Sequence, residues 1–326
     1  MSKKVKMAII GCGDFLRWQA DDIKNSKYLE VAKLYDPKKE ASAKFAKELG
    51  GKTVNIEDEI ISDPEIKVVA QFVPPWIRGT QFIRLAKAGK HIITTKPLAS
   101  TVKECKSIVM SAKKFNIRAG VIYNRTGDGF IQTAKNVLEN GTLGKLALYR
   151  QDWIHAYPKW NKWATDPKKN GGPFMDAMIH NLNSANYLMG REIASKSFFS
   201  ENLAHPELSC ADTEGMILKY KGGGIANLFI TWAADLATYS LNGNDREHID
   251  IFYLVTDKGW RITKEWRNDG CLLIASRDGK KMEIKVTPSK KTIYDEFIQH
   301  IGGKVFPERL VSLEDALADI VTVRNK

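Results

Sequence analysis

The sequence of 326 residues has few cysteines, and their spacing supports neither a zinc site nor a disulfide framework. No C-x-x-C spacing joins the four of them, Cys12, Cys105, Cys210 and Cys271. Long apolar runs are also missing. No stretch approaches the ~20 residues of a membrane span, and residues 7–10 are too short for the core of a signal peptide. We therefore expect a soluble, cytoplasmic protein with no bound metal and no membrane partner.

Acidic residues are in deficit, with 38 Asp and Glu against 50 Lys and Arg, which gives a net charge of +12. The lysines are spread along the chain, mostly as doublets such as Lys38-Lys39 and Lys280-Lys281. A nucleic-acid surface would gather them on one face or in a known module, so we expect no nucleic-acid partner. The positive field still favours anionic ligands such as a dinucleotide.

Short β-branched runs alternate with helical patterns from residue 5 to residue 123. The strand-like runs cover residues 5–10, 30–35, 68–73, 91–94 and 119–123. Helical patterns occupy residues 39–49 and 77–88, and Thr101 with Glu104 forms a capping box for a further helix. This repeated strand–helix–strand order predicts an α/β fold with a parallel sheet of the Rossmann type.

The pattern changes after residue 123. One helical stretch at residues 130–140 is followed mainly by strand-like runs, at residues 146–153, 215–220, 225–232, 248–256 and 281–286. They predict an α+β domain built on a large, mainly antiparallel sheet, whose free face suits a subunit contact. We therefore divide the chain into a Rossmann dinucleotide-binding domain at residues 1–123 and an α+β substrate-binding and oligomerisation domain at residues 124–326.

A glycine pair without a third glycine follows the first strand, in AIIGCGDFLRW at residues 8–18. Gly11 and Gly13 fit the first half of the dinucleotide fingerprint G-x-G-x-x-G, and Leu16 stands at its third position. Gly11 permits the tight turn, and Gly13 lets a pyrophosphate approach the N-terminus of the next helix. The third glycine serves helix–strand packing, so its loss leaves phosphate contact intact. The expected cofactor contacts of this turn are Gly11, Cys12, Gly13, Asp14 and Phe15.

An acidic residue ends the second predicted strand. Asp36 follows Gly13 by 23 residues, where a carboxylate accepts hydrogen bonds from the adenosine ribose and repels a 2′-phosphate. This favours NAD as the cofactor. Lys38 and Lys39 offset the repulsion, so NADP stays open as the alternative.

Residues 88–101, AGKHIITTKPLAST, resemble the segment AGKHVLVEKPLA of the glucose-fructose oxidoreductase, inositol dehydrogenase and rhizopine-catabolism family (Gfo/Idh/MocA), with Lys96-Pro97 at its Lys-Pro. Four more segments resemble family motifs in the same order. QFVPPWIRGTQF is similar to its T-P-N-x-x-H turn, GVIYNRTGD to its G-x-N-R segment, and NGTLGKL to its G-x-L-G turn. Residues 162–190 are similar to its W-R…G-G-G…D-x-G-x-H…L-G region.

The chain also departs from the family pattern, at Val73, Pro75, Thr95, Ala164, Pro173, Met178 and Asn183. None of these changes removes a proton-handling group. They put the identity of the substrate in doubt more than the chemistry.

The resemblance implies an NAD(P)-dependent oxidoreductase that moves a hydride between a nicotinamide and a secondary alcohol or ketone of a sugar, sugar acid or cyclitol. Oxidation of an alcohol needs a base and a cation for the developing alkoxide. The resemblance makes His180 the base, Asp176 its orienter or a substrate ligand, and Lys96 the alkoxide donor. Asp176 and His180 are four residues apart and so share a helix face. On the residues alone, such a pair also fits an ordinary surface helix.

Further contacts complete the predicted site. Aromatic residues concentrate in QDWIHAYPKWNKW at residues 151–163, which suits a sugar ring and equally suits a strand core with a packed loop. The additional cofactor contacts are Val73, Pro74, Trp76, Lys96 and Trp163. The substrate contacts are Lys96, Arg125, His155, Asp176 and His180.

Two other functions remain open. Some relatives use a tightly held NAD transiently, to cleave glycosides by oxidation and elimination. The third hypothesis is a catalytically silent dinucleotide-sensing or interaction protein. Retention of Lys96, Asp176 and His180 argues against the silent protein. The family commonly pairs its sheet faces, so we expect a homodimer or homotetramer.

Overall fold

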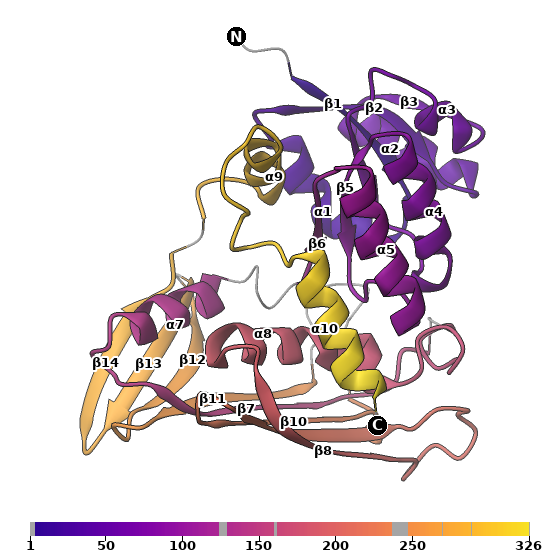
Figure 1. Cartoon of the computed structure of the whole chain (residues 1–326). Coiled ribbons are helices and arrows are strands. Elements are labelled where there is room, and N and C mark those ends of the chain that lie inside the picture. The colour runs from indigo at the N-terminus through magenta and orange to yellow at the C-terminus, as the bar shows by residue number, and fades with distance from the viewer. Residues whose placement is uncertain are drawn as a thin grey trace. The chain divides into compact units, whose positions relative to one another are not determined.

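The computed structural model describes residues 4–123, 129–159, 162–236, 247–268, 270–287 and 289–325 (Figure 1). The chain forms two compact units. Unit 1 comprises Met1–Tyr123 and Ser289–Arg324, and unit 2 comprises Asn124–Pro288 and Asn325–Lys326. The sequence analysis placed all residues after 123 in the second domain, whereas residues 289–324 here belong with unit 1.

Unit 1 contains a six-stranded sheet in the order β3-β2-β1-β4-β5-β6, and each neighbouring pair is parallel. The strands are β1 (Val5–Ile10), β2 (Leu29–Tyr35), β3 (Lys52–Thr53), β4 (Val68–Gln71), β5 (His91–Thr95) and β6 (Ala119–Ile122). The helices between them are α1 (Asp14–Lys24), α2 (Lys39–Leu49), α3 (Asp58–Ile61), α4 (Pro75–Lys87) and α5 (Val102–Lys114). The predicted Rossmann sheet is confirmed.

Local sequence signals account for several of these elements. The predicted capping box is present, because the Thr101 side chain accepts a hydrogen bond from the Glu104 amide at the start of α5. Leu16, at the position of the missing third glycine, is fully buried and belongs to the hydrophobic core of the unit. Helix α1 therefore packs on the sheet through a leucine side chain, without the closer approach that a glycine permits.

Helices α9 (Ile293–Ile301) and α10 (Leu313–Arg324) complete unit 1. Ile293, Tyr294 and Phe297 are buried in the same core as Leu16. Helix α10 packs against α5, and Val311 pairs with Val121 of strand β6 through a β-bridge. This apolar burial explains why the C-terminal segment returns to unit 1.

Unit 2 contains an eight-stranded sheet in the order β14-β13-β12-β11-β7-β10-β9-β8. All neighbouring pairs are antiparallel except β10 with β7. The strands are β7 (Leu146–Ile154), β8 (Ile193–Glu201), β9 (Thr213–Tyr220), β10 (Ile225–Thr231), β11 (Ile249–Thr256), β12 (Arg261–Arg267), β13 (Gly270–Arg277) and β14 (Lys280–Lys285). The prediction of a large, mainly antiparallel sheet is confirmed, although it omitted β8, β12 and β13.

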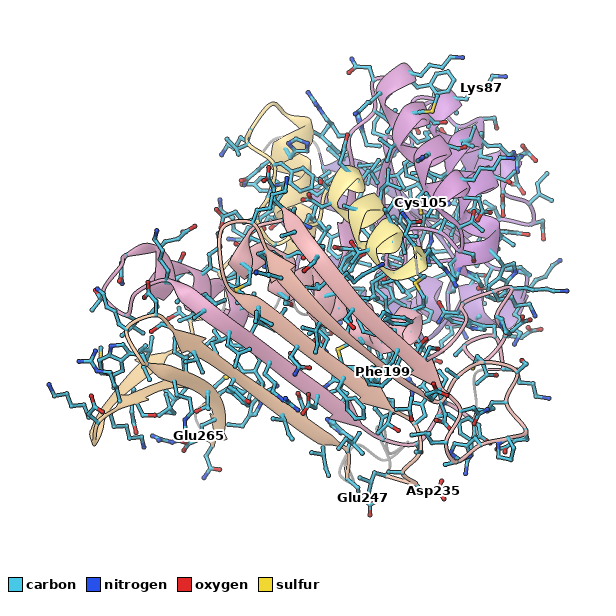
Figure 2. All side chains as sticks on the ribbon, turned by 60° about the horizontal axis from the view of Figure 1, so that its bottom comes forward. Lys87, Cys105, Phe199, Asp235, Glu247 and Glu265 are labelled. Carbon is cyan, nitrogen blue, oxygen red and sulfur yellow. The ribbon has the colours of Figure 1, made fainter. Side chains whose placement is uncertain are left out.

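One face of this sheet carries the helical elements of unit 2, which are α7 (Gly129–Glu139), the π-helix η1 (Phe174–Met178) and α8 (Ile179–Met189). Figure 2 looks onto the opposite face, where Phe199 lies. In neither unit does a described helix combine the length and the apolar character that crossing a membrane requires.

Candidate active site

The glycine turn between β1 and α1 provides an open approach to a helix N-terminus. Gly11 has φ +94°, and a Cβ added there would lie 2.4 Å from the carbonyl oxygen of Phe72, so this turn requires glycine. Gly13 is the N-cap of α1, and a Cβ added there would meet nothing within 4 Å. Because Gly13 offers no capping oxygen, the first turn of α1 can donate its N–H groups to a phosphate. These features fit a dinucleotide.

Asp36 joins the glycine turn to the start of α2. One carboxylate oxygen accepts a hydrogen bond from the Cys12 amide and the other from the Lys38 amide, both at 2.8 Å. Each oxygen keeps a second lone pair that can accept a ribose hydroxyl. Burial, with the charge of Asp36, raises the pKa of the Cys12 thiol to about 12, so Cys12 stays a neutral thiol near pH 7.

The turns after β4 and β5 lie at the same, carboxyl edge of the parallel sheet as the glycine turn. Val73 is buried, Pro74 is the N-cap of α4, and Lys96 is half-buried in the turn after β5. The guanidinium of Arg78 connects these two turns, because it donates to the carbonyl oxygens of Val73, Thr95 and Pro97.

The other predicted residues of unit 1 surround the glycine turn. Asp14 is exposed and pairs with Arg17, and the ring of Phe15 lies edge-on to that of Phe72, with 5.0 Å between centroids. Trp76 is half-buried in the first turn of α4. Unit 1 therefore gathers all of its predicted cofactor residues at one edge of its sheet.

In unit 2 the Asp-His pair occupies the junction of η1 and α8. Asp176 is half-buried on η1, and His180 is 6% exposed in the first turn of α8. The Asn170 side chain donates to Asp176 Oδ1 at 3.0 Å, which fixes the orientation of the carboxylate. Single π-helical turns that continue into an α-helix occur frequently at functional sites.

A buried glutamate anchors the start of this segment. Glu214 on β9 is 5% exposed and accepts hydrogen bonds from the Phe174 amide at 2.8 Å and the Ser200 hydroxyl at 3.1 Å. The helix dipole also stabilises a carboxylate that lies at a helix N-terminus. Glu214 therefore fixes the first turn of η1, two residues before Asp176.

His155 is a second buried imidazole in unit 2. It is 5% exposed, and its Nδ1 lies 2.7 Å from the carbonyl oxygen of Ala156. Since that oxygen only accepts, Nδ1 carries the proton and Nε2 is the acceptor, with no hydrogen-bond partner among the described residues. Burial lowers the pKa of His155, and the charge of Asp176 opposes this, so the two groups interact.

Two further residues were predicted to contact the ligands. Trp163 is half-buried in the loop before η1, and Arg125 lies outside the described residues. Sequence reasoning missed Arg78, Asn170 and Glu214. A charged side chain among the buried positions of α4 was the available signal for Arg78, whereas Asn170 and Glu214 are recognisable only from their contacts.

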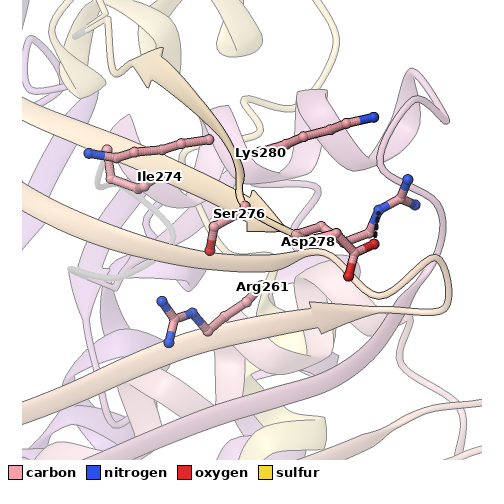
Figure 3. Close-up of a pocket in the computed structure, with 8 residues that line it drawn as sticks. Arg261, Ile274, Ser276, Asp278 and Lys280 are labelled. Carbon is pink, nitrogen blue, oxygen red and sulfur yellow. Dashed lines mark ion pairs between the residues drawn. The ribbon is translucent and has the colours of Figure 1, made fainter.

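We also considered a metal site and a surface recess as alternative functional sites in the described part of the chain. Among the residues that the structure describes, no three His, Cys, Asp or Glu side chains come together to hold a metal ion. A shallow recess at the β13–β14 hairpin is lined by basic residues such as Arg261, Arg277 and Lys280, with Asp278 (Figure 3). It contains none of the predicted site residues.

Comparison with known sequences identifies the class and then the family. Residues 5–123 match the family described as "Oxidoreductase family, NAD-binding Rossmann fold", which defines the class of protein whose N-terminal domain this chain shares. Residues 131–259 match the "GFO/IDH/MocA C-terminal domain". The chain belongs to the Gfo/Idh/MocA family, as its motifs predicted.

Curated relatives include dehydrogenases of cyclitols. The chain is 30% identical over 210 residues to a scyllo-inositol 2-dehydrogenase (NAD(+)) of Bacillus subtilis. This match covers 63% of this chain and 60% of the relative. It is 26% identical over 228 residues to a myo-inositol 2-dehydrogenase of Thermotoga maritima, covering 68% and 66%. An uncharacterized oxidoreductase of Streptococcus pneumoniae is 28% identical over 65% of this chain. The matches span 58% to 67% of the length of the first curated relatives.

Solved structures share the fold over nearly the whole chain. An aldose-aldose oxidoreductase from Caulobacter crescentus superposes with a TM-score of 0.83 at 19% identity, covering 99% of this chain and 96% of the other. An oxidoreductase from Agrobacterium radiobacter, in complex with NAD+, L-tartaric acid and magnesium, gives a TM-score of 0.80 at 17% identity, covering 98% and 94%. At these identities the likeness establishes the fold.

Proposed function

We propose that this oxidoreductase transfers a hydride between NAD and a secondary alcohol or ketone of a cyclitol, sugar or sugar acid. The observation that carries the proposal is the buried His180 following the oriented Asp176 in a family of NAD-binding oxidoreductases. Relatives named for the oxidation of inositols, together with a levoglucosan dehydrogenase of Pseudarthrobacter phenanthrenivorans, support a polyol ring as the substrate class.

In this proposal His180 accepts the hydroxyl proton of the substrate, and Asp176 holds the imidazole or a neighbouring substrate hydroxyl in place. Lys96 donates a hydrogen bond to the substrate oxygen as negative charge develops on it. His155 accepts a second substrate hydroxyl at Nε2. NAD, held by the glycine turn and Asp36, supplies the hydride acceptor.

The proposal is tested with a panel of inositols, aldoses and uronates, each offered with NAD and with NADP. We expect NADH formation, followed by its near-ultraviolet absorbance, on at least one polyol ring. Glycoside cleavage without net NADH formation would instead indicate the redox hydrolase reaction, in which the hydride returns to the product.

On the best substrate, His180→Ala is expected to lower kcat by about 10²–10⁴ while NAD affinity stays nearly unchanged. Lys96→Ala should lower kcat as well, and the double variant should be little worse than either single one because the groups act as a unit. A deuterated substrate shows whether hydride transfer limits the rate. If it does, and the His180→Ala enzyme still keeps more than about a tenth of the wild-type kcat, His180 is not the base.

A further inference from the structure

Arg78 is a buried cation that binds only backbone carbonyl groups in the described contacts. It lies in the first turns of α4 and is 2% exposed. Its guanidinium donates to the carbonyl oxygens of Thr95, at 2.6 Å, and of Pro97 and Val73. These three oxygens lie at two places in the chain, the turn after β4 and the end of β5 with the turn that follows it.

The cost of this arrangement is high for a purely structural contact. Burial lowers the pKa of Arg78 to about 9, and no carboxylate among the described residues forms an ion pair with it. An apolar side chain of similar volume often replaces a buried charge without loss of stability. What an apolar side chain does not supply is a set of donors that holds two turns in one geometry.

The bonded carbonyls bracket Lys96. Thr95 precedes this residue and Pro97 follows it, and one nitrogen of Arg78, Nη1, donates to both carbonyl oxygens. The Lys96 amide itself donates to the Ile122 carbonyl at 3.3 Å. The backbone at Lys96 is therefore held on both sides by Arg78 and from strand β6 by the sheet.

We propose that Arg78 is a positioning residue, which sets the Lys96 side chain and the Val73-Pro74 turn against NAD without contacting the substrate. The inference rests on the proposed function, in which Lys96 stabilises the substrate oxygen. Misplacement of a reacting group by about 1 Å can lower a rate about 10²-fold. Arg78 therefore controls both cofactor affinity and turnover.

The test compares Arg78→Met with a matched control, Lys90→Met. Lys90 is also a buried cation of unit 1, 4% exposed, and it too donates to two backbone carbonyls, those of Asp63 and Ile66. It precedes β5, and its partners precede β4, so these contacts lie at the amino edge of the same sheet. Each variant loses a buried cation, but only Arg78→Met releases the turns at the carboxyl edge.

Three quantities are measured in wild type and in both variants. They are the Kd of NAD from fluorescence titration, kcat on the best substrate, and the NMR signal of Lys96 after reductive methylation with ¹³C-formaldehyde, assigned through its loss in Lys96→Arg. Melting temperatures establish that the variants are folded. The first and third readouts need no substrate, so they judge the inference even if the panel shows no turnover and the proposed function fails.

We expect Arg78→Met to shift the Lys96 signal, to weaken NAD binding several-fold and to lower kcat by about 10–100-fold. Lys90→Met should leave the Kd of NAD and kcat within about twofold of wild type and the Lys96 signal unmoved, at a comparable loss of melting temperature. Arg78→Lys, which keeps a single donor group, should give intermediate values and replaces Arg78→Met if that variant fails to fold. An unmoved Lys96 signal, or NAD affinity equal to that of Lys90→Met, would overturn the inference.

Discussion

At the scale of single residues, Asp36 has a structural role in its turn and a proposed role in cofactor binding, and substitutions can separate the two. Its carboxylate accepts hydrogen bonds from the amides of Cys12 and Lys38, and we propose that it also accepts the ribose hydroxyls of NAD. Asp36→Ala should weaken NAD binding, whereas NADP binding should hold or improve, because the repulsion of the 2′-phosphate disappears. We expect the ratio of the two Kd values to change by about tenfold, which corresponds to roughly 1.4 kcal/mol.

Asp36→Asn is the matched control, since it removes the charge and keeps an acceptor for one of the two amides. Titration of both variants with NAD and NADP measures the effect. Equal losses of affinity for the two cofactors would show that Asp36 does not read the ribose.

His155 predicts a dependence of stability on pH. Its pKa in the folded protein lies below the ordinary 6.5, chiefly because the imidazole is buried. The unfolded chain therefore binds a proton before the folded protein does, and the free energy of unfolding falls as pH drops through and below about 6.5. In His155→Gln this loss is absent.

The measurement is the melting temperature of wild type and of His155→Gln between pH 7.5 and 5. Any advantage of wild type at the upper end should narrow as the pH falls, since the other histidines are common to both proteins. A difference that stays constant or widens would contradict the buried, neutral state of His155.

At the scale of elements, a buried carboxylate adds to the apolar contacts that hold α9 to unit 1. Asp295 is 3% exposed, and its Oδ1 accepts hydrogen bonds from the Ser26 hydroxyl at 2.5 Å and the amides of Lys27 and Tyr28 at 3.0 and 3.3 Å. Asp295→Ala removes a charged acceptor from buried donors and should lower the free energy of unfolding of unit 1 by about 2–3 kcal/mol. Calorimetric or denaturant unfolding measures this loss.

Glu65→Ala serves as the control, because Glu65 forms an ion pair with Lys6 at the surface and is 61% exposed. Its unfolding midpoint should equal that of wild type within error. If Asp295→Ala behaves like Glu65→Ala, the contact with residues 26–28 contributes nothing to the attachment of α9.

The sequence predicted the elements that have strong local signals. Residues 5–10 and 39–49 form a strand and a helix with the predicted bounds, and Thr101 caps α5 as expected. Strands β8, β12 and β13 were missed because polar and charged residues such as Lys196, Lys264 and Ser276 interrupt their apolar residues. Whether such segments form strands depends on their burial by tertiary contacts, which the propensities of single residues do not encode.

The candidate site divides in the same way. The sequence predicted its glycine turn, Lys96 and the Asp-His pair, because each belongs to a motif whose residues have a fixed spacing along the chain. Arg78 and Glu214 contact backbone groups that are distant in the sequence and that only folding brings close. Thr95 lies 17 residues from Arg78, and Phe174 lies 40 residues from Glu214. No spacing rule connects such residues, so the sequence alone did not reveal them.

At the scale of the whole molecule, the sheet of unit 2 exposes apolar side chains on the face away from its own helices (Figure 2). Cross-strand pairing places on this face several residues that are 40–48% exposed, namely Phe199, Ile217, Ile225, Ile249 and Ile251. Exposed apolar patches of this kind mark interaction surfaces. We propose that this face joins two copies of the chain.

The expected outcome is a dimer or tetramer in sedimentation velocity at micromolar concentration. Ile251→Lys, on strand β11, should shift the protein toward the monomer because it places a charge in the contact. Met110→Lys is the control, as Met110 is 69% exposed on α5 of unit 1. A wild-type protein that sediments only as a monomer would count against the proposal.

The return of residues 289–324 to unit 1 has a consequence for synthesis on the ribosome. Translation produces residues 4–123 first, then all the strands and helices of unit 2, and only afterwards α9 and α10. Until then the nascent Rossmann sheet lacks the side chains of Ile293, Tyr294 and Phe297 that close its core. Unit 2 has all of its strands before unit 1 has all of its helices, so the N-terminal half of this protein is the last to mature.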